Sequence, residues 1–381
     1  MKLAQVDITP IEGLVAELWE RGGTDIHIGA GAPPLMRIDG DLHPVAGHEP
    51  LHPEDIERLA EAMLPPEMRE QFELTRQVDF SFSWKDITRF RGNVFRQRGA
   101  VSMALRAIPY QIPTMEELLL PPVMEYFCHQ RQGLVLMTGP TGSGKSTTQA
   151  AMVGFINATH RKHILTLEDP IEYVHGHGLS LVSQREIGFD TASFDDGLRA
   201  ALREDPDVVL VGEMRDPESI ATTLTIAETG HLVFATLHTN DASTAIDRII
   251  DVFPSDRQAQ IRTQLAASLT GVVAQRLIPR VDGGMIGAFE ILLANSAVRA
   301  LIREGKTHQI RNVISQSVRD GMQTLEQSLS VLVAHGLISH EDALARAVVP
   351  KEIRGPAPMA AGPDGNPAPD SSAEGSFAPS A

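Results

Sequence analysis

Nine consecutive residues combine glycines, hydroxyl side chains and one lysine in an order that fits phosphate binding. They are Gly139, Pro140, Thr141, Gly142, Ser143, Gly144, Lys145, Ser146 and Thr147, and they satisfy the pattern G-x-x-x-x-G-K-[ST]. Glycines let successive backbone N–H groups point at one anion, and the dipole of a helix that begins there favours phosphate. Lys145 would bring its charge to the β- and γ-phosphates, and the Ser146 hydroxyl would ligate Mg²⁺. The motif therefore predicts binding of ATP and Mg²⁺.

The residues on either side of this loop support the interpretation. An apolar segment, residues 134–137, precedes the loop and is expected to form a strand, and residues 146–157 are expected to form a helix. The alternative is a glycine-rich turn that binds nothing. That alternative gives no packing reason for a lysine followed by a serine at the start of a helix, so phosphate binding is favoured.

Carboxylates follow two further apolar segments, 163–167 and 208–212, which are expected to form strands. Ligands of α/β sheets bind at such strand ends. The second strand resembles a Walker B strand, but Gly212 stands where an aspartate is often found, so Glu213 is expected to serve the Mg²⁺ shell through water. Glu172 is then the candidate base that positions the attacking water, with Glu168 and Asp169 supporting it. Taken alone, such acids are as often helix caps or solvated residues, and the phosphate loop favours the catalytic interpretation.

Two histidines bracket the expected strand 231–236. His238 follows the C-terminal end of that strand, on the ligand side of the sheet, and is a candidate γ-phosphate sensor. His231 lies at the other end and is the weaker candidate. For both, a hydrogen-bonded structural histidine is the alternative.

Several arginines lie on strands expected near the N-terminus: Arg89, Arg91, Arg96, Arg98 and Arg106. One hypothesis is that they reach a neighbouring subunit's nucleotide in trans. The alternative, favoured by the residues alone, is a solvated sheet face that pairs with the many acidic side chains. The single cysteine, Cys128, is expected to be a small packing residue.

The 381 residues suggest two domains. Residues 1–108 are expected to form an α/β or α+β domain, and 109–122, which contain four prolines, a linker with a short helix. From 123 to 350, strands alternate with amphipathic helices, which predicts a parallel sheet covered by helices and a mostly helical section over 257–346. The last residues, 351–381, are rich in Pro, Gly, Ala and Ser and are expected to be disordered. In the first domain we expect helices 11–21 and 54–63 and strands 25–28, 34–38, 78–84, 88–97 and 101–107.

Composition argues against several classes of protein. The chain carries 49 acidic and 33 basic residues, a net charge of −16, which disfavours nucleic-acid binding. One cysteine excludes an intrachain disulfide framework and a multi-cysteine zinc site. No targeting segment is visible, and the apolar runs are far shorter than the roughly 20 residues that span a bilayer. A cytoplasmic protein is therefore expected, one that docks on a membrane only through another protein.

Longer motifs resemble those of the type II/IV secretion ATPase superfamily and, within it, the pilus retraction ATPases of the PilT type. They are GPTGSGKSTT (139–148), LEDPIEYVH (167–175), SQREIG (183–188), LREDPDVVLVGEMRD (202–216) and AETGHLVFATLHTNDA (227–242). The resemblance covers roughly residues 10–350 and includes GGTDIHIGAGAPPLMRIDG (22–40). Several long motifs in order are far more specific than a phosphate loop alone.

The resemblance implies a role for each matching residue. Glu172 matches the water-activating glutamate of the family's Asp box, Glu213 its Walker B glutamate, and His231 and His238 its His box. Residues 297–302, AVRALI, resemble the AIRNLI motif that retraction needs, with Ala300 in place of asparagine.

The resemblance also implies an assembly. The family forms a ring of six, with a PAS-like first domain and a RecA-like second domain. First-domain arginines face the nucleotide, and Arg91, Arg96 and Arg106 are the candidates here. Assembly ATPases of the superfamily carry a four-cysteine insertion, which a chain with one cysteine lacks, so a retraction motor is favoured.

The expected function is therefore Mg²⁺-dependent hydrolysis of ATP by a homohexamer. Movement between the domains would turn an inner-membrane pilus platform protein, shorten the pilus and drive twitching motility from the cytoplasmic face of the inner membrane. Three alternatives stay open. They are an accessory retraction ATPase of the PilU type that works with a paralogous main motor, a nucleotide-switched binding module, and a DNA translocase, which the acidic balance disfavours.

Overall fold

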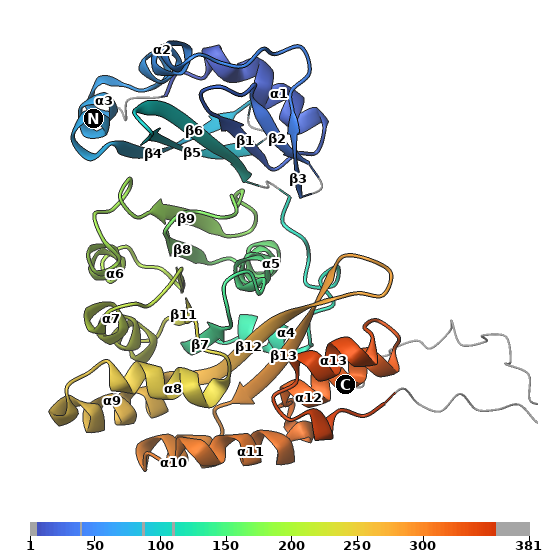
Figure 1. Cartoon of the computed structure of the whole chain (residues 1–381). Helices are drawn as coiled ribbons and strands as arrows, with labels where there is room; N and C mark the ends of the chain where they lie inside the picture. Colours follow the sequence, from blue (N-terminus) through green and yellow to red (C-terminus); the bar gives the residue numbers. More distant parts are fainter. Residues whose placement is uncertain (1–5, 39, 86–87, 109–110, 356–381) are drawn as a thin grey trace, which may run out of the picture. The chain divides into compact units, whose positions relative to one another are not determined.

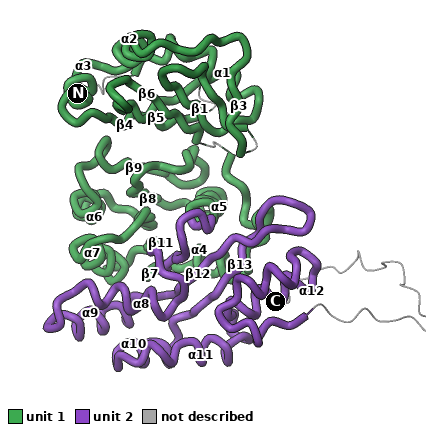
Figure 2. Tube along the Cα trace, in the orientation of Figure 1, with its two compact units in different colours: residues 1–134, 146–236 green, residues 135–145, 237–381 purple. Residues whose placement is uncertain are grey.

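A computed structural model describes residues 6–38, 40–85, 88–108 and 111–355 (Figure 1). The chain divides into two compact units (Figure 2). The first compact unit consists of residues 1–134 and 146–236, and the second of residues 135–145 and 237–381. These units do not coincide with the predicted domains 1–108 and 123–350, because residues 146–236 cluster with the N-terminal part of the chain.

An antiparallel sheet of six strands forms the N-terminal part of the first compact unit, in the order β3-β2-β1-β6-β5-β4. Its strands are β1 (Asp25–Ile28), β2 (Leu35–Ile38), β3 (Asp41–Pro44), β4 (Gln77–Trp84), β5 (Thr88–Gln97) and β6 (Ala100–Ile108). The accompanying helices are the 3-10 helix η1 (Thr9–Ile11), α1 (Glu12–Glu20), α2 (Pro53–Met63) and α3 (Pro66–Thr75). This α+β arrangement was expected from the sequence, whereas its PAS-like character stays a prediction.

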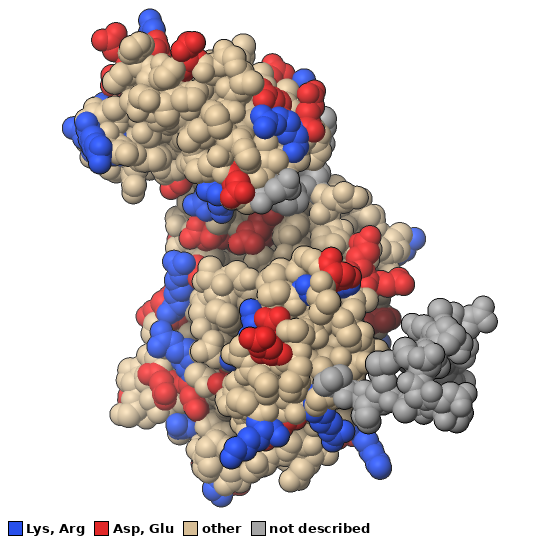
Figure 3. All heavy atoms as spheres, turned by 45° about the vertical axis from the view of Figure 1, so that its right-hand side comes forward, with Lys and Arg blue, Asp and Glu red and all other residues tan. Residues whose placement is uncertain are grey.

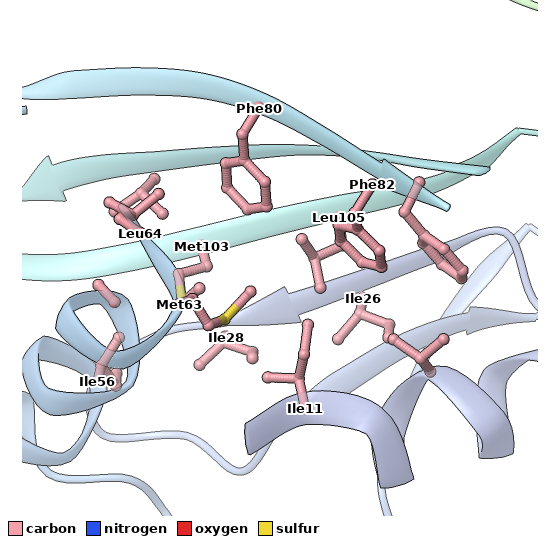
Figure 4. Close-up of a cluster of buried hydrophobic side chains, with 14 of the residues drawn as sticks. Ile11, Ile26, Ile28, Ile56, Met63, Leu64, Phe80, Phe82, Met103 and Leu105 are labelled. Carbon is pink, nitrogen blue, oxygen red and sulfur yellow. The ribbon is translucent and has the colours of Figure 1, made fainter. Parts of the chain in front are cut away.

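Alternation of apolar and polar residues explains how this sheet buries one face. Along β4, Val78, Phe80, Phe82 and Trp84 are buried, and the residues between them are exposed or half-buried. Phe80 and Phe82 meet side chains from α1, α2 and the neighbouring strands in one apolar cluster (Figure 4). Helix α3 was missed in the sequence because Pro66 suggested a boundary, yet proline is well suited to the first position of a helix.

The second sheet contains seven strands. In the first compact unit, four of them lie in the order β9-β8-β10-β11 and are parallel: β9 (Leu181–Glu186), β8 (His163–Glu168), β10 (Val208–Val211) and β11 (Leu232–Thr236). Figure 1 shows α5 (Lys145–Thr159) on one side of these strands and α6 (Phe194–Ala201) and α7 (Pro217–Glu228) on the other. All residues of β10 and β11 are buried, as a parallel sheet covered on both faces requires.

The other three strands belong to the second compact unit, in the order β7-β12-β13. They are β7 (Gly133–Thr138), β12 (Leu269–Pro279) and β13 (Met285–Leu293), and the last two pair antiparallel. The remaining helices are α4 (Val123–Cys128) in the first unit and, in the second, α8 (Ala242–Asp251), α9 (Ser255–Ser268), α10 (Ser296–Arg303), α11 (Ile310–Gln316), α12 (Leu325–Ala334) and α13 (His340–Arg346), with the 3-10 helices η2 (Thr307–Gln309), η3 (Val318–Asp320) and η4 (Pro350–Glu352).

The predicted helical section over 257–346 was therefore wrong in its middle. Strand β12 is buried along most of its length. In such a continuous apolar segment, hydrophobic periodicity cannot distinguish a buried strand from a buried helix. Gly283 and Gly284, both with positive φ, form the turn between β12 and β13. They were the signal that the sequence offered.

The structure differs from the sequence predictions in the linker and at the start of the expected tail. The expected linker helix, residues 115–120, is a series of turns, and linker residues 109–110 lie outside the described residues. The expected tail begins later than residue 351, because η4 ends at Glu352, whose carboxylate lies 2.7 Å from the Arg311 guanidinium. Residues 356–381 lie outside the described part of the chain.

Among the described residues, none of the helices combines the length and apolarity that crossing a membrane requires.

Candidate functional site: a phosphate loop and strand-end carboxylates

The phosphate loop lies between β7 and α5. Gly139, Gly142 and Gly144 all have positive φ, the conformation that turns backbone N–H groups toward one point. Lys145 is 8% exposed, and its Nζ donates to the carbonyls of Gly139 (2.8 Å) and Pro140 (3.0 Å). The lysine is thus folded back across its own loop. Its positive charge therefore lies at the carbonyl oxygens of the loop.

A buried glutamine that sequence reasoning missed packs against this loop. A Cβ atom at Gly139 would lie 2.3 Å from the Gln275 carbonyl oxygen, and one at Gly144 would lie 2.9 Å from Gln275 Nε2. Gln275 is 3% exposed on β12. The signal was a polar residue within an apolar run, and it was lost because the segment was predicted to be helical. Close approach to backbone therefore requires glycine at 139, and the positive φ angle favours glycine at both positions.

His238 lies beside the start of the loop, within the second compact unit. The N–H of Leu237 donates to Met137 (2.9 Å), and Thr138 Oγ1 donates to the carbonyl of Thr239 (2.6 Å). His238 is therefore held between two residues that are bonded to the last residues before Gly139. This places it at the loop, where a phosphate sensor is expected.

His231 has a different environment. Its Nδ1 lies 3.0 Å from the carbonyl oxygen of Ile226 and 3.3 Å from Thr229 Oγ1, both at the C-terminal end of α7. Its own carbonyl accepts from the N–H of Gly133 (3.0 Å). These contacts fit the alternative interpretation of His231 as a hydrogen-bonded structural histidine. His231 also lies at the opposite end of β11 from His238. A direct nucleotide role for it stays a prediction.

Close packing explains why glycine occupies position 212. The N–H of Gly212 donates to Leu167 (2.8 Å), and a Cβ here would lie 3.1 Å from the Leu167 oxygen and 3.2 Å from the Glu168 Cα. A side chain at position 212 would therefore press on the backbone at the end of β8, and the acid stands at the next residue instead. Glu213 is buried and its Oε1 lies 2.5 Å from Arg215 Nη2. Arg215 was not predicted as part of the site.

Glu168 organises the loop that carries Glu172. Its carboxylate accepts from Thr166 Oγ1 (2.6 Å), Gln184 Nε2 (3.2 Å) and the N–H of Glu172 (3.4 Å). Burial raises the pKa of Glu168, although these hydrogen bonds oppose the rise. Glu172 itself is exposed at the loop surface, as a residue that meets solvent water must be.

Gln184 of β9 is a second residue that the sequence did not reveal. Besides Glu168, its Nε2 donates to the carbonyl of Tyr173 (2.8 Å), and its Oε1 accepts from the N–H of His175 (2.7 Å). The Tyr173 hydroxyl lies 2.9 Å from Thr147 Oγ1 on the first turn of α5. The loop after β8 is therefore held by β9 on one side and touches the residue after Ser146 on the other.

The candidate arginines all have acidic partners within the chain. Arg91 lies 3.7 Å from Asp79, and Arg106 lies 2.7 Å from Asp25. Arg96 lies 3.2 Å from both Glu57 and Glu73. These pairs fit the solvated-face alternative, and a role in trans stays a prediction. Acidic and basic side chains are also interspersed on the face drawn in Figure 3.

Arg89, one of the first-domain arginines but not one of the three candidates chosen from the resemblance, makes the most buried of these contacts. It donates to Ser81 Oγ (2.7 Å) and to Glu186 of β9 (3.2 Å), and only 4% of the Glu186 side chain is exposed. Burial raises the pKa of Glu186, and the charge of Arg89 opposes the rise. Arg89 therefore joins β5 to the strand that carries Gln184.

The motif at residues 297–302 forms a helix clamp. Arg299 donates from Nε to Ala294 (2.8 Å), from Nη1 to Ala266 and Ala267, and from Nη2 to Leu269 (2.7 Å). These carbonyls belong mainly to the C-terminal end of α9, which such a planar fork of donors can satisfy. Ala300, the departure from the family pattern, is half-buried on α10 beside this clamp.

The donor set fits Mg²⁺ bound mainly through a nucleotide. Among the described residues, no group of three or more His, Cys, Asp or Glu side chains could hold a metal ion by itself. Mg²⁺ usually keeps several waters and takes one or two protein ligands beside substrate phosphates. The Ser146 hydroxyl and the buried Glu213 carboxylate are groups of the type that could serve as such ligands.

Comparison with known proteins gives consistent results along the chain. A family model described as "Type II/IV secretion system protein" matches residues 57–285. The type IV pilus retraction ATPase PilT of Pseudomonas aeruginosa is 46% identical over 348 residues, 91% of this chain and 100% of that protein. The type IV pilus ATPase PilU of the same organism is 42% identical over 344 residues, 90% of each chain.

A solved structure, described as the pilus retraction motor PilT with bound ADP, is similar in fold as well. It is 50% identical to this chain and has a TM-score of 0.84, covering 90% of this chain and 98% of that one. The mixed α/β architecture is therefore shared over nearly the whole length.

Proposed function

Because the chain belongs to the type II/IV secretion ATPase family, we propose that it is a pilus retraction motor that hydrolyses ATP. The observation that carries this proposal is the phosphate loop, where three positive-φ glycines surround a buried lysine that is bonded to the carbonyls of the loop. Similarity to a pilus retraction ATPase over 91% of the chain supports retraction as the process that the hydrolysis drives.

The residues of the loop bind and neutralise the phosphates. Backbone N–H groups of the loop donate to phosphate oxygens, and Lys145 Nζ exchanges the carbonyls of Gly139 and Pro140 for them. Ser146 and Glu213, the latter through water, would hold Mg²⁺, which would supply further positive charge. Glu172 orients a water molecule and accepts its proton as that water attacks the γ-phosphorus, which gives ADP and phosphate. His238 donates a hydrogen bond to an oxygen of the γ-phosphate as negative charge develops there.

We further propose a ring of six chains. In it, a PAS-like first domain would present Arg91, Arg96 or Arg106 to the nucleotide on the RecA-like domain of its neighbour. Movement between the domains would turn a platform protein in the inner membrane, so that pilin subunits leave the base of the fibre. The motor would then work at the cytoplasmic face of that membrane and would drive twitching motility.

Steady-state phosphate release from the purified chain tests the ATPase. Lys145→Ala removes the phosphate-binding charge and Glu213→Ala removes the Mg²⁺ ligand, so each is expected to lower turnover by at least about 100-fold. Lys306→Ala is a matched control, because Lys306 is an exposed lysine paired with Glu304 (2.8 Å). Normal turnover in both site variants would refute the assignment.

Deletion of the gene, followed by imaging of the pili, tests the cellular role. Extra pili and lost surface motility are expected for a main retraction motor. The 42% identity to PilU supports a second candidate, an accessory retraction ATPase. Deletion would then leave retraction working through another motor, whereas cells without pili would point to assembly.

A further inference from the structure

Two histidines face each other at the ends of two helices in the first compact unit. His129 is the C-cap of α4, and His160 directly follows α5, the helix that begins at Lys145. Nδ1 of His129 lies 3.1 Å from Nε2 of His160, and the ring centroids are 5.0 Å apart. Neither ring has a part in the site described above.

The outer contacts fit one assignment of the ring protons. Thr159 Oγ1 donates its only proton to the carbonyl of Phe155 (2.6 Å), so it can only accept from His160 Nδ1, 2.7 Å away. On the other ring, His129 Nε2 lies 3.4 Å from Glu125 Oε1, and an ionised carboxylate also only accepts. Since a neutral imidazole has one N–H, both facing nitrogens then carry lone pairs.

Two lone pairs at this distance repel unless a cation lies between them. With Zn–N bonds of about 2.05 Å, a nitrogen separation of 3.1 Å corresponds to an N–Zn–N angle of about 98°, between octahedral and tetrahedral values. The outer contacts also match those of metal-bound histidines, whose second nitrogen usually donates to a carboxylate or another oxygen. Glu125 and Thr159 supply these oxygens.

We propose that His129 and His160 form a binding site for one divalent transition-metal ion of the class that imidazole favours, with Zn²⁺ as the example. No cluster of three or more such side chains occurs in the described part of the chain, so water completes the coordination. Such an open site is weaker than a four-ligand structural zinc site. A bound ion would tie the C-terminal end of α4 to that of the phosphate-loop helix.

Charged groups of both signs surround the histidine pair. Lys162 lies close enough to His160 for its positive charge to oppose a bound cation. The carboxylate of Glu125 and the negative end of the α5 dipole offset that repulsion.

Calorimetric titration of the full chain with ZnCl₂, with any purification tag removed, tests the proposal. We expect one ion per chain beyond those that a nucleotide brings. Binding should be lost in His129→Asn and in His160→Asn and be about 10- to 100-fold weaker in Glu125→Gln. His335→Asn is the matched control, because His335 is an exposed C-cap of another helix, α12, and should bind as the wild type does.

Two further measurements separate a metal site from a structural role. Zn²⁺ should raise the melting temperature of the wild type and of His335→Asn but not of the two ligand variants. With Cu²⁺ in place of Zn²⁺, electron paramagnetic resonance should show coupling to two imidazole nitrogens. Absence of binding to the wild type, or equal binding by the ligand variants, would overturn the proposal and leave a histidine pair that shares a proton.

Discussion

Gly212→Ala tests whether close packing between β10 and β8 sets the position of the candidate carboxylates Glu168 and Glu213. The added Cβ would lie 3.1 Å from the Leu167 oxygen and 3.2 Å from the Glu168 Cα, so the end of β8 must move by about 0.2–0.3 Å to reach the 3.4 Å of an ordinary contact. Both neighbours are backbone atoms within a sheet. Overpacking of this kind costs about 1–3 kcal/mol.

The expected result has a thermal and a kinetic part. The melting temperature should fall by about 2–4 °C for each kcal/mol lost. Displacement of Glu168 and Glu213 should lower kcat roughly tenfold, since small misplacements of catalytic groups are costly. Phosphate release and thermal unfolding of the same preparation measure both.

Gly13→Ala is the control for this substitution. Gly13 lies in α1, and a Cβ added there would meet no described atom within 4 Å beyond its own helix and chain neighbours. The variant should gain about 0.5–1 kcal/mol from the helix propensity of alanine. If Gly212→Ala kept both the melting temperature and kcat of the wild type, the packing explanation for glycine at this position would be refuted.

Three more outcomes are expected. Gln184→Met removes the contacts that hold the Glu172 loop, so kcat should fall about tenfold while the KM for ATP stays unchanged; an unchanged kcat would contradict this. Burial lowers the pKa of His175 to about 4, so between pH 7 and pH 5 the unfolded chain binds a proton that the folded chain does not. On going from pH 7 to pH 5, the free energy of unfolding measured in urea should therefore fall by about 2 kcal/mol more for the wild type than for His175→Gln. Arg299→Lys cannot satisfy the end of α9 and should lower the free energy of unfolding by about 2 kcal/mol; equal thermal stability would contradict the clamp.

The loop and the strand ends were predictable because their signals are local. The order of residues 139–147 fixes a phosphate loop, and short apolar strands placed Glu172, Glu213 and His238 at the ends of strands. The contacts that hold these residues are not local. Gln275 approaches the loop from a strand more than 130 residues away, and nothing in its own segment indicates this neighbour.

The first-domain arginines show the same limit. Their sequence pattern, alternating along strands, predicts one face but not a partner. Arg96 meets Glu57 and Glu73, two residues on helices, and Arg89 meets Glu186 in the other sheet. Arginine and glutamate are too common for sequence spacing to select such pairs, so only packing of the elements does.

Strand β9 is the element where these contacts converge. Side chains two residues apart point to the same face of a strand, so Gln184 and Glu186 lie side by side. Gln184 holds the loop that carries Glu172, and Glu186 binds Arg89 from the N-terminal sheet. A movement of that sheet which breaks the Arg89–Glu186 pair would leave a nearly buried carboxylate without this cation, two residues from the glutamine that holds the Glu172 loop. In the proposed motor, part of the free energy of such a movement would therefore fall on the strand that holds the candidate site.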